Sequence, residues 1–158
     1  MSYLLDTNIF IRSKNDLPMD IFQGFWIRLE ELARAGQIFS CVKVKEEIDR
    51  GNDELKKWCN EHLPREFFLP FEAYGEYARL MTWANENPVF TVPAKHEFAT
   101  VADAYLVSTA AAKGMKVVTF ETSDPHCKKR VKVPDACIAL GVEFCSLNDV
   151  FYELNVVV

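Results

Sequence analysis

Residues 100–121, TVADAYLVSTAAAKGMKVVTFE, decide the fold. The Ala-rich run Thr100 to Lys113 predicts a helix, and Gly114 is a natural stop at its carboxyl end. The run Lys116 to Phe120 follows almost at once and is apolar enough to predict a buried strand. A helix that feeds directly into a buried strand is the unit of an α/β fold. An acid, Glu121, comes immediately after this strand.

The rest of the chain repeats this alternation of strand-like and helical patterns. Further apolar runs of strand length lie at Tyr3 to Leu5, Gln37 to Val42 and Val142 to Cys145. Helical patterns lie at Asp20 to Ala35, Val44 to Arg50, Asp53 to Leu63 and Phe71 to Asn85. The stretch Asn87 to Pro93, with its two prolines, is expected to be a loop. Strands too apolar to face water, alternating with helices, predict a three-layer α/β/α sandwich with a central parallel sheet.

Composition favours a single domain over residues 1–158 and excludes some classes of function. The chain is 49% hydrophobic and 26% charged, which fits neither a disordered chain nor a mini-protein scaffold. Its 18 Lys and Arg against 23 Asp and Glu give a formal net charge of −5, which argues against binding of a polyanion by bulk charge. No apolar run is long enough to span a membrane and the start lacks a secretory pattern, so we expect a cytoplasmic protein without a membrane partner.

Four acids stand where strands of the predicted sheet end or where helices begin: Asp6, Glu47, Asp103 and Glu121. In parallel α/β sheets ligands bind beyond the carboxyl ends of the strands, and this placement brings the four acids to one edge. Three of these acids have an ordinary alternative when each is taken alone. Asp6 and Asp103 could cap the turn or helix that follows, and Glu47 could lie at a solvated helix start.

Like charges held that close repel one another, so a cluster of four carboxylates is tenable chiefly with a divalent cation. Oxygen ligands favour Mg²⁺ or Mn²⁺ over Zn²⁺. The five cysteines and three histidines are scattered without the spacing of a zinc site. Because Mg²⁺ commonly completes its shell with substrate phosphate oxygens, the cluster indicates phosphodiester hydrolysis.

The order and spacing of these motifs resemble those of the PIN domains, metal-dependent nucleases that include the VapC-type toxins of toxin–antitoxin pairs. Four segments between residue 3 and about residue 124 carry the resemblance: Leu4 to Asn8, Glu47 to Gly51, Asp103 to Ala110, and Val117 to Glu121. The ordered set is specific, whereas any one segment alone would be a weak signal. The resemblance implies a PIN-like α/β/α fold and a metal-dependent nuclease site.

The resemblance also implies a role for each matching residue. The acids that match the three metal-binding positions are Asp6, Glu47 and Asp103. Glu121 falls where the family usually has Asp, so its longer side chain could bind the metal directly or support it through water. Thr7 and Asn8 match polar residues that hold the first Asp in relatives. Glu46 is expected to lie on the surface.

The densest basic run follows the turn after Glu121 and comprises Lys128, Lys129, Arg130 and Lys132. Beside an active site these side chains would bind the phosphates of RNA, whereas an isolated run of this kind is usually a solvated loop. Asp135 could add a carboxylate to the site, but we expect it to cap a helix over Ala136 to Leu140.

The function implied by the resemblance is a Mg²⁺- or Mn²⁺-dependent endoribonuclease, the toxin of a type II toxin–antitoxin system. RNA would be its substrate, an antitoxin protein its partner and a homodimer one assembly. Two alternatives stay open. The carboxyl-terminal part resembles a less characterised PIN-like subfamily, which is compatible with a non-catalytic module that binds RNA or protein. A Mg²⁺-dependent phosphatase is less favoured, because Asp6 lacks the adjacent second acid that such enzymes use.

Overall fold

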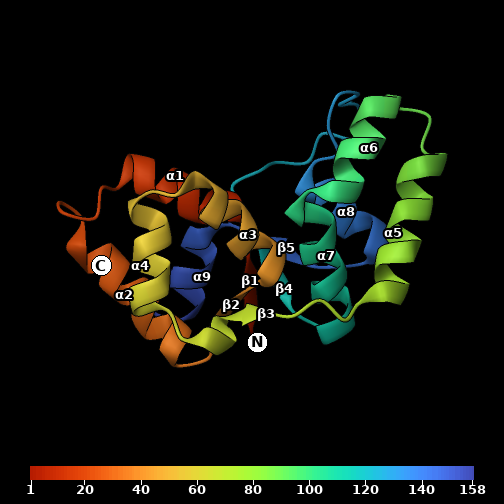
Figure 1. The fold of residues 1–158 in the computed structure, drawn as a ribbon. Helices are drawn as coiled ribbons and strands as arrows, with labels where there is room; N and C mark the ends of the chain where they lie inside the picture. The colour runs from red at the N-terminus through yellow and green to blue at the C-terminus, as the bar shows by residue number, and fades with distance from the viewer.

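The computed structural model describes residues 1–158 and contains a five-stranded sheet with helices on both faces (Figure 1). The strands are β1 (Tyr3–Leu5), β2 (Ile38–Cys41), β3 (Phe68–Leu69), β4 (Lys116–Val118) and β5 (Phe144–Cys145). Their order in the sheet is β3-β2-β1-β4-β5, and every neighbouring pair is parallel. The predicted α/β/α fold with a central parallel sheet is therefore confirmed.

The helices make up most of the chain. They are α1 (Thr7–Asp16), α2 (Gln23–Arg34), α3 (Val42–Gly51), α4 (Glu54–His62), α5 (Tyr74–Glu86), α6 (Val92–Thr100), α7 (Ala102–Lys113), α8 (Val133–Leu140) and α9 (Leu147–Glu153), with a 3-10 helix η1 (Arg65–Phe67). In Figure 1, α2 and α9 lie on one side of the sheet and α5 and α7 on the other. None of these helices combines the length and the apolar character needed to cross a membrane.

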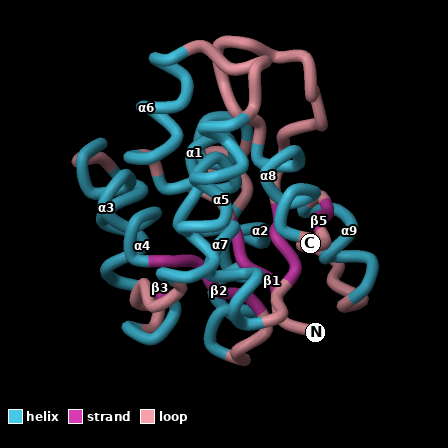
Figure 2. Tube along the Cα trace, turned by 90° about the vertical axis from the view of Figure 1, so that its right-hand side faces the viewer, coloured by secondary structure: helices cyan, strands magenta, loops and turns pink.

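The order of the strands reverses between β1 and β4. The chain runs outward from β1 to β2 and β3, then returns across the sheet to β4 and continues outward to β5. Leu5 of β1 pairs with Val118 of β4, so these two strands end side by side. Figure 2 shows the strands in the middle of the molecule and long loops gathered at one end, beside α6. Crevices at such a switch point are the usual ligand sites of open parallel sheets.

The two central strands are buried on both faces, as their composition predicts. Leu4, Leu5, Val117 and Val118 are completely inaccessible to solvent. They belong to a core of 38 buried residues that extends into the helices on either side. Because both faces of the sheet are covered, any polar group at the end of these strands is taken out of water unless a crevice reaches it.

The sequence did not predict α1, α6 or α9, and each of these helices begins at a side-chain cap. The Asp6 carboxylate accepts hydrogen bonds from two amides of α1, and the Thr91 hydroxyl accepts one from the Ala94 amide of α6. Ser146 and Asp149 form a reciprocal capping box at α9. Helix α6 starts at Val92, within the stretch that the two prolines made look like a loop. These capping residues are signals of a helix start that can be read from the sequence.

Candidate active site

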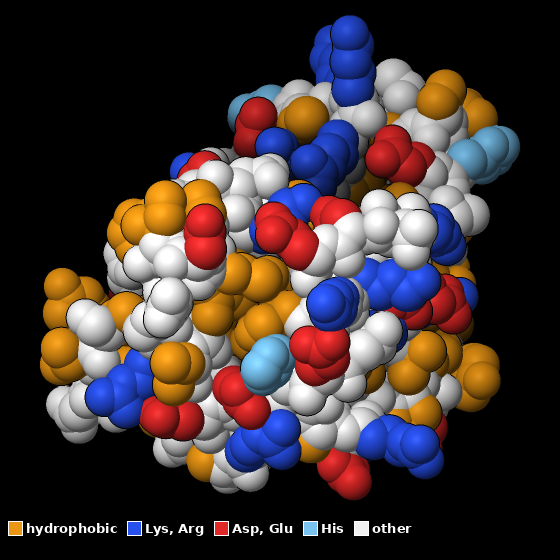
Figure 3. Space-filling view, turned by 60° about the vertical axis from the view of Figure 1, so that its left-hand side comes forward, with side chains coloured by type: hydrophobic (Ala, Val, Ile, Leu, Met, Phe, Trp, Pro, Cys, Tyr) orange, Lys and Arg blue, Asp and Glu red, His pale blue; other side chains and the backbone are white.

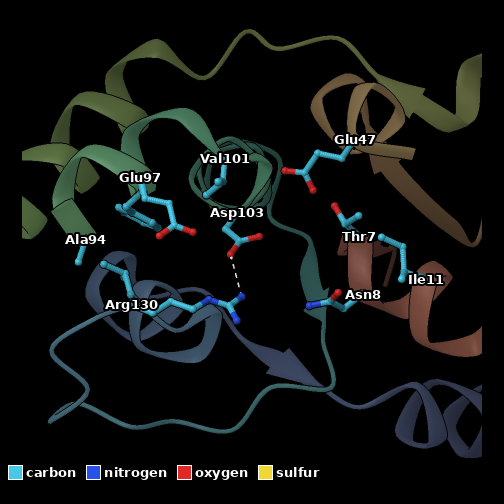
Figure 4. Close-up of a pocket in the computed structure, with 11 residues that line it drawn as sticks. Thr7, Asn8, Ile11, Glu47, Ala94, Glu97, Val101, Asp103 and Arg130 are labelled. Carbon is cyan, nitrogen blue, oxygen red and sulfur yellow. Dashed lines mark ion pairs between the residues drawn. The ribbon is translucent and has the colours of Figure 1, made fainter. Parts of the chain in front are cut away.

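A pocket of about 260 Å³ opens beyond the carboxyl ends of β1 and β4, at the switch point of the sheet. Its polar lining comes from five different parts of the fold, as Figure 4 shows. The side chains concerned are Thr7 and Asn8 of α1, Glu47 of α3, Glu97 of α6, Asp103 of α7 and Arg130 of the loop before α8. Residues far apart in the sequence therefore meet where the topology places a ligand site.

Asp6 lies directly after β1, next to the pocket residue Thr7, and is 2% exposed. One carboxylate oxygen, Oδ1, accepts hydrogen bonds from the backbone amides of Asn8 at 2.8 Å and Ile9 at 3.2 Å, and so caps α1. The other oxygen, Oδ2, has no hydrogen-bond partner. Burial raises the pKa of Asp6 to about 6 and the charge of Glu121 adds to the rise, while the nearby Thr119 hydroxyl and the α1 amides oppose it. The predicted capping role is thus met by one oxygen, which leaves the other available.

Asp103 lies in the first turn of α7, and its side chain is 17% exposed. It does not cap its own helix. The N-cap residue of α7 is Val101, whose apolar side chain cannot accept a hydrogen bond. Burial raises the pKa of Asp103 to about 7, and the charges of Asp6, Glu121 and Glu47 add to the rise. The ordinary alternative for this acid, a helix cap, is therefore wrong.

Glu47 supplies the cap that α7 lacks. Its Oε1 accepts a hydrogen bond of 2.9 Å from the backbone amide of Ala102, the first residue of α7. Helix α3 begins at Val42, so Glu47 lies in the middle of α3 and the alternative of a solvated helix start is wrong. By contrast, Glu46 is exposed, as predicted, and pairs with Lys43 at 3.5 Å. Glu46 and Glu47 are adjacent in the sequence, yet only Glu47 lies at the site.

Removal of the Glu47 carboxylate has a measurable cost to folding. We expect Glu47→Ala to lower stability by about 1 kcal/mol more than Glu47→Gln, because only the amide side chain keeps an acceptor for the Ala102 amide. Both variants remove the same charge, so the difference between them isolates the cap. Thermal unfolding of the two variants without metal measures it, and equal melting temperatures would contradict the capping role.

Glu121 and Arg130 form an ion pair at the edge of the site. Both carboxylate oxygens of Glu121 lie 2.9 Å from Nη2 of Arg130, and the same nitrogen lies 3.5 Å from Oδ2 of Asp103. The Glu121 side chain is 9% exposed and that of Arg130 is 41% exposed. The sequence grouped Arg130 with three lysines as a run that binds RNA. In the structure Arg130 turns inward among the acids, whereas Lys128 and Lys129 remain exposed on the loop and Lys132 is half-buried at the start of α8.

Thr7 and Asn8 lie beside Asp6, but their side chains do not hold it through hydrogen bonds. The contact from Asn8 comes from its backbone amide, and its side chain is exposed toward the pocket. The Thr7 hydroxyl is buried and has no hydrogen-bond partner. An unpartnered hydroxyl next to an unpartnered carboxylate oxygen is unusual in a folded protein and points to a ligand.

Asp135 does not cap α8, which corrects the expectation for this residue. Helix α8 begins at Val133, so Asp135 lies within its first turn. The Asp135 carboxylate accepts hydrogen bonds from the Ser123 hydroxyl at 2.5 Å and from the Asp124 amide at 2.9 Å. It therefore fastens the loop between β4 and α8, which carries both Glu121 and Arg130. A polar residue of the pocket that the sequence did not indicate is Glu97, an exposed acid of α6, which is a helix that was not predicted.

The chemistry of the site fits a divalent cation. As the side chains stand, no three Asp, Glu, His or Cys residues converge closely enough to hold a metal ion, and Arg130 supplies the positive charge. However, the available donors are carboxylate and hydroxyl oxygens, Asp6 Oδ2 and Thr7 Oγ1 have no partner, and two acids have a raised pKa. Hard oxygen donors of this kind suit Mg²⁺ or Mn²⁺. Asp6, Glu47 and Asp103 are the residues that would hold the ion.

Comparisons with known proteins agree with the fold. The chain resembles the crystal structure of VapBC2 from Rickettsia felis bound to a DNA fragment from their promoter, with a TM-score of 0.57, 18% identity, and coverage of 92% of this chain and 98% of that one. It also resembles FitAB bound to the IR36 DNA fragment, with a TM-score of 0.53, 20% identity and coverage of 91% and 94%. FitAcB from Neisseria gonorrhoeae gives a TM-score of 0.53, 20% identity and coverage of 90% and 95%.

These structural likenesses show that the fold is PIN-like. No curated protein matches the sequence significantly. A family model described as "Domain of unknown function (DUF4411)" matches residues 3–158, which is nearly the whole chain. The chain therefore belongs to the DUF4411 family and has a PIN-like fold.

Proposed function

We propose that the protein is a Mg²⁺- or Mn²⁺-dependent endoribonuclease that acts in the cytoplasm as the toxin of a toxin–antitoxin pair. One observation carries the proposal. Three acids from separate elements, Asp6, Glu47 and Asp103, lie around the switch point of the sheet, where the charges of Asp6 and Glu47 act on Asp103, and the deepest of them, Asp6, has an unpartnered carboxylate oxygen. Such an arrangement is costly in the absence of a cation, because the like charges repel in a partly dry site.

The three acids would hold the cation, and their neighbours fix the orientation of each acid. When bound, a divalent cation supplies Lewis-acid activation of water and of phosphate oxygens. Asp6 is fixed by its cap to α1 and presents Oδ2, and Glu47 is fixed by its bond to α7. Asp103 faces Glu47 across the pocket, close to Arg130. Each acid is thus oriented by backbone amides or by a charged neighbour before a substrate arrives.

The distribution of surface charge and the structural likenesses bear on the proposed substrate and partner. On the face drawn in Figure 3, Lys and Arg are interspersed with Asp and Glu and form no continuous basic surface. RNA binding would therefore depend on the site itself, together with Lys128, Lys129 and Lys132 on the adjoining loop, rather than on bulk charge. The structural likeness to VapBC2 and FitAB supports an antitoxin protein as partner. A homodimer is part of the proposal and does not rest on these likenesses.

A non-catalytic module that binds RNA or protein is the second candidate. It is favoured by the ion pairs of Arg130 with Glu121 and Asp103, because they neutralise the acids without a metal.

Cleavage of a labelled single-stranded RNA decides between the two candidates. We expect the wild-type protein to cut the RNA with Mg²⁺ or Mn²⁺ and to stop when EDTA is added. Glu47→Gln should lose this activity, and the adjacent Glu46→Gln, on the solvent side of α3, should keep it. Binding of RNA without cleavage across a titration of both metals would instead establish the binding module.

A further inference from the structure

We propose that Arg130 is the residue that binds the scissile phosphate and that Glu121 positions Arg130 instead of binding the metal. This inference rests on the proposed nuclease function and refines it. It reduces the metal-binding set to Asp6, Glu47 and Asp103.

Glu121 is already fully engaged by its neighbours. Both of its carboxylate oxygens lie 2.9 Å from Nη2 of Arg130, and its backbone amide donates to the Thr119 hydroxyl at 3.0 Å. The side chain is 9% exposed and does not line the pocket. To bind a metal it would have to give up a charge-assisted contact in a largely dry position, which is costly.

Arg130, in contrast to Glu121, is partly exposed in the pocket and has N–H groups without a partner. Only its Nη2 makes a hydrogen bond or ion pair within the protein, so the N–H groups on Nε and Nη1 have no hydrogen-bond partner there. The side chain is 41% exposed, and Figure 4 shows it extending into the middle of the pocket between Asp103 and Asn8. A guanidinium group presents several N–H donors in one plane, which matches the oxygens of a phosphate.

The charge of the pocket requires such a residue. The acids that line it are Glu47, Glu97 and Asp103, with Asp6 and Glu121 behind them, and Arg130 is the only Lys or Arg in the lining. A phosphodiester brings a further negative charge into this site. The guanidinium is therefore the one fixed positive group of the pocket that can receive it, in addition to any cation.

The loop that carries Arg130 is held in place. Asp135 fastens Ser123 and Asp124 near its beginning, and the Thr91 amide donates to the Lys128 carbonyl at 3.0 Å near its end. The next residue after Arg130, Val131, is buried in the core. The loop is thus anchored near both of its ends, and Glu121 holds the guanidinium itself. The group is therefore preorganised to bind a phosphate.

Two titrations and a cleavage assay test the assignment without depending on nuclease turnover alone. Adenosine 5′-monophosphate serves as a probe of the phosphate position, Mn²⁺ as a probe of the metal position, and both are followed by calorimetry. Arg130→Gln and Glu121→Gln should each weaken binding of the nucleotide at least about tenfold and change the Mn²⁺ affinity less than about threefold. RNA cleavage should fall by roughly 10²- to 10³-fold in kcat/KM.

Further variants separate positioning from direct contact. Arg130→Lys should recover only part of the nucleotide binding, because a lysine is a point charge without the planar donor pattern. The double variant should be little worse than Arg130→Gln alone, since Glu121 acts through Arg130. Arg65→Gln is the matched control: Arg65 is exposed, makes no ion pair and precedes β3, so it lies at the opposite end of the strands from the site.

Two results would overturn the assignment. The first is a loss of Mn²⁺ affinity in Glu121→Gln as large as that in Asp6→Asn, which would make Glu121 a metal ligand. The second is a variant Arg130→Gln that performs as well as the wild type or better. Equal nucleotide binding would remove Arg130 from the phosphate position, and faster RNA cleavage would make Arg130 a competitor of the metal. If the wild type cuts no RNA, the nuclease proposal fails, yet nucleotide binding that depends on Arg130 would still support the phosphate position.

Discussion

Asp103→Asn should lower metal-dependent RNA cleavage by at least about 10³-fold, which corresponds to about 4 kcal/mol of transition-state stabilisation. The substitution removes one of the three acids proposed to hold the ion and keeps the size of the side chain. Asp103 makes no capping hydrogen bond, and its nearest charged contact is Arg130 at 3.5 Å, so the fold should be retained. Initial rates of RNA cleavage at saturating Mg²⁺ measure the effect.

The matched control is Asp20→Asn, at an exposed acid between α1 and α2 whose side chain makes no hydrogen bond or ion pair. It should cleave at the wild-type rate. Circular dichroism on both variants shows whether the secondary structure is kept. Undiminished cleavage by a folded Asp103→Asn protein would remove Asp103 from the reaction.

The second large effect concerns stability and pH. Without metal, the protein should lose on the order of 3 kcal/mol of stability between pH 5 and pH 8. The reason is that Asp6 and Asp103 have pKa values of about 6 and about 7 in the folded protein, against 3.8 for the ordinary side chain, mainly because they are buried. In this interval the folded state holds more protons than the unfolded state, so stability falls as the pH rises and the two groups become charged.

The melting temperature should accordingly drop by roughly 6–12 °C over this interval in EDTA. Acids with a lowered pKa, such as Glu30 and Asp53, have the opposite dependence but are already ionised above pH 5. Addition of Mg²⁺ at pH 8 should restore much of the loss, because the ion binds the charged form. The variant with both Asp6→Asn and Asp103→Asn should show little dependence on pH or Mg²⁺. A wild-type melting temperature that rises from pH 5 to pH 8 would contradict the assignment.

The sequence predicted the central part of the fold well because its signals are local. Strand β1 coincides with the predicted Tyr3 to Leu5, and β2, β4 and β5 lie within the predicted runs. These strands are short and mostly apolar, and the central pair β1 and β4 is buried, so each strand falls in a short, mainly apolar run of the sequence. Strand β3 was missed, since it comprises only Phe68–Leu69 and follows a 3-10 helix among other aromatic residues.

The contacts inside the site could not be predicted, because they join residues far apart in the chain. The bond from Ala102 to Glu47 closes the amino end of α7 with a side chain 55 positions away, and nothing in either segment indicates it. The inward turn of Arg130 depends on Glu121 and Asp103, and on the loop that Asp135 fastens. From the sequence alone Arg130 is one of four basic residues in a run. That residues 1–158 form a single domain stays a prediction.

Calorimetric titration of Mn²⁺ into the wild-type protein and into Asp103→Asn tests the central claim most directly, since it asks whether the acids at the end of β1 and at the start of α7 hold a divalent ion. The account predicts saturable binding to the wild type at pH 8 and a loss of affinity of at least about tenfold in the variant. Equal Mn²⁺ affinity in the two proteins, or no binding to either, would contradict it.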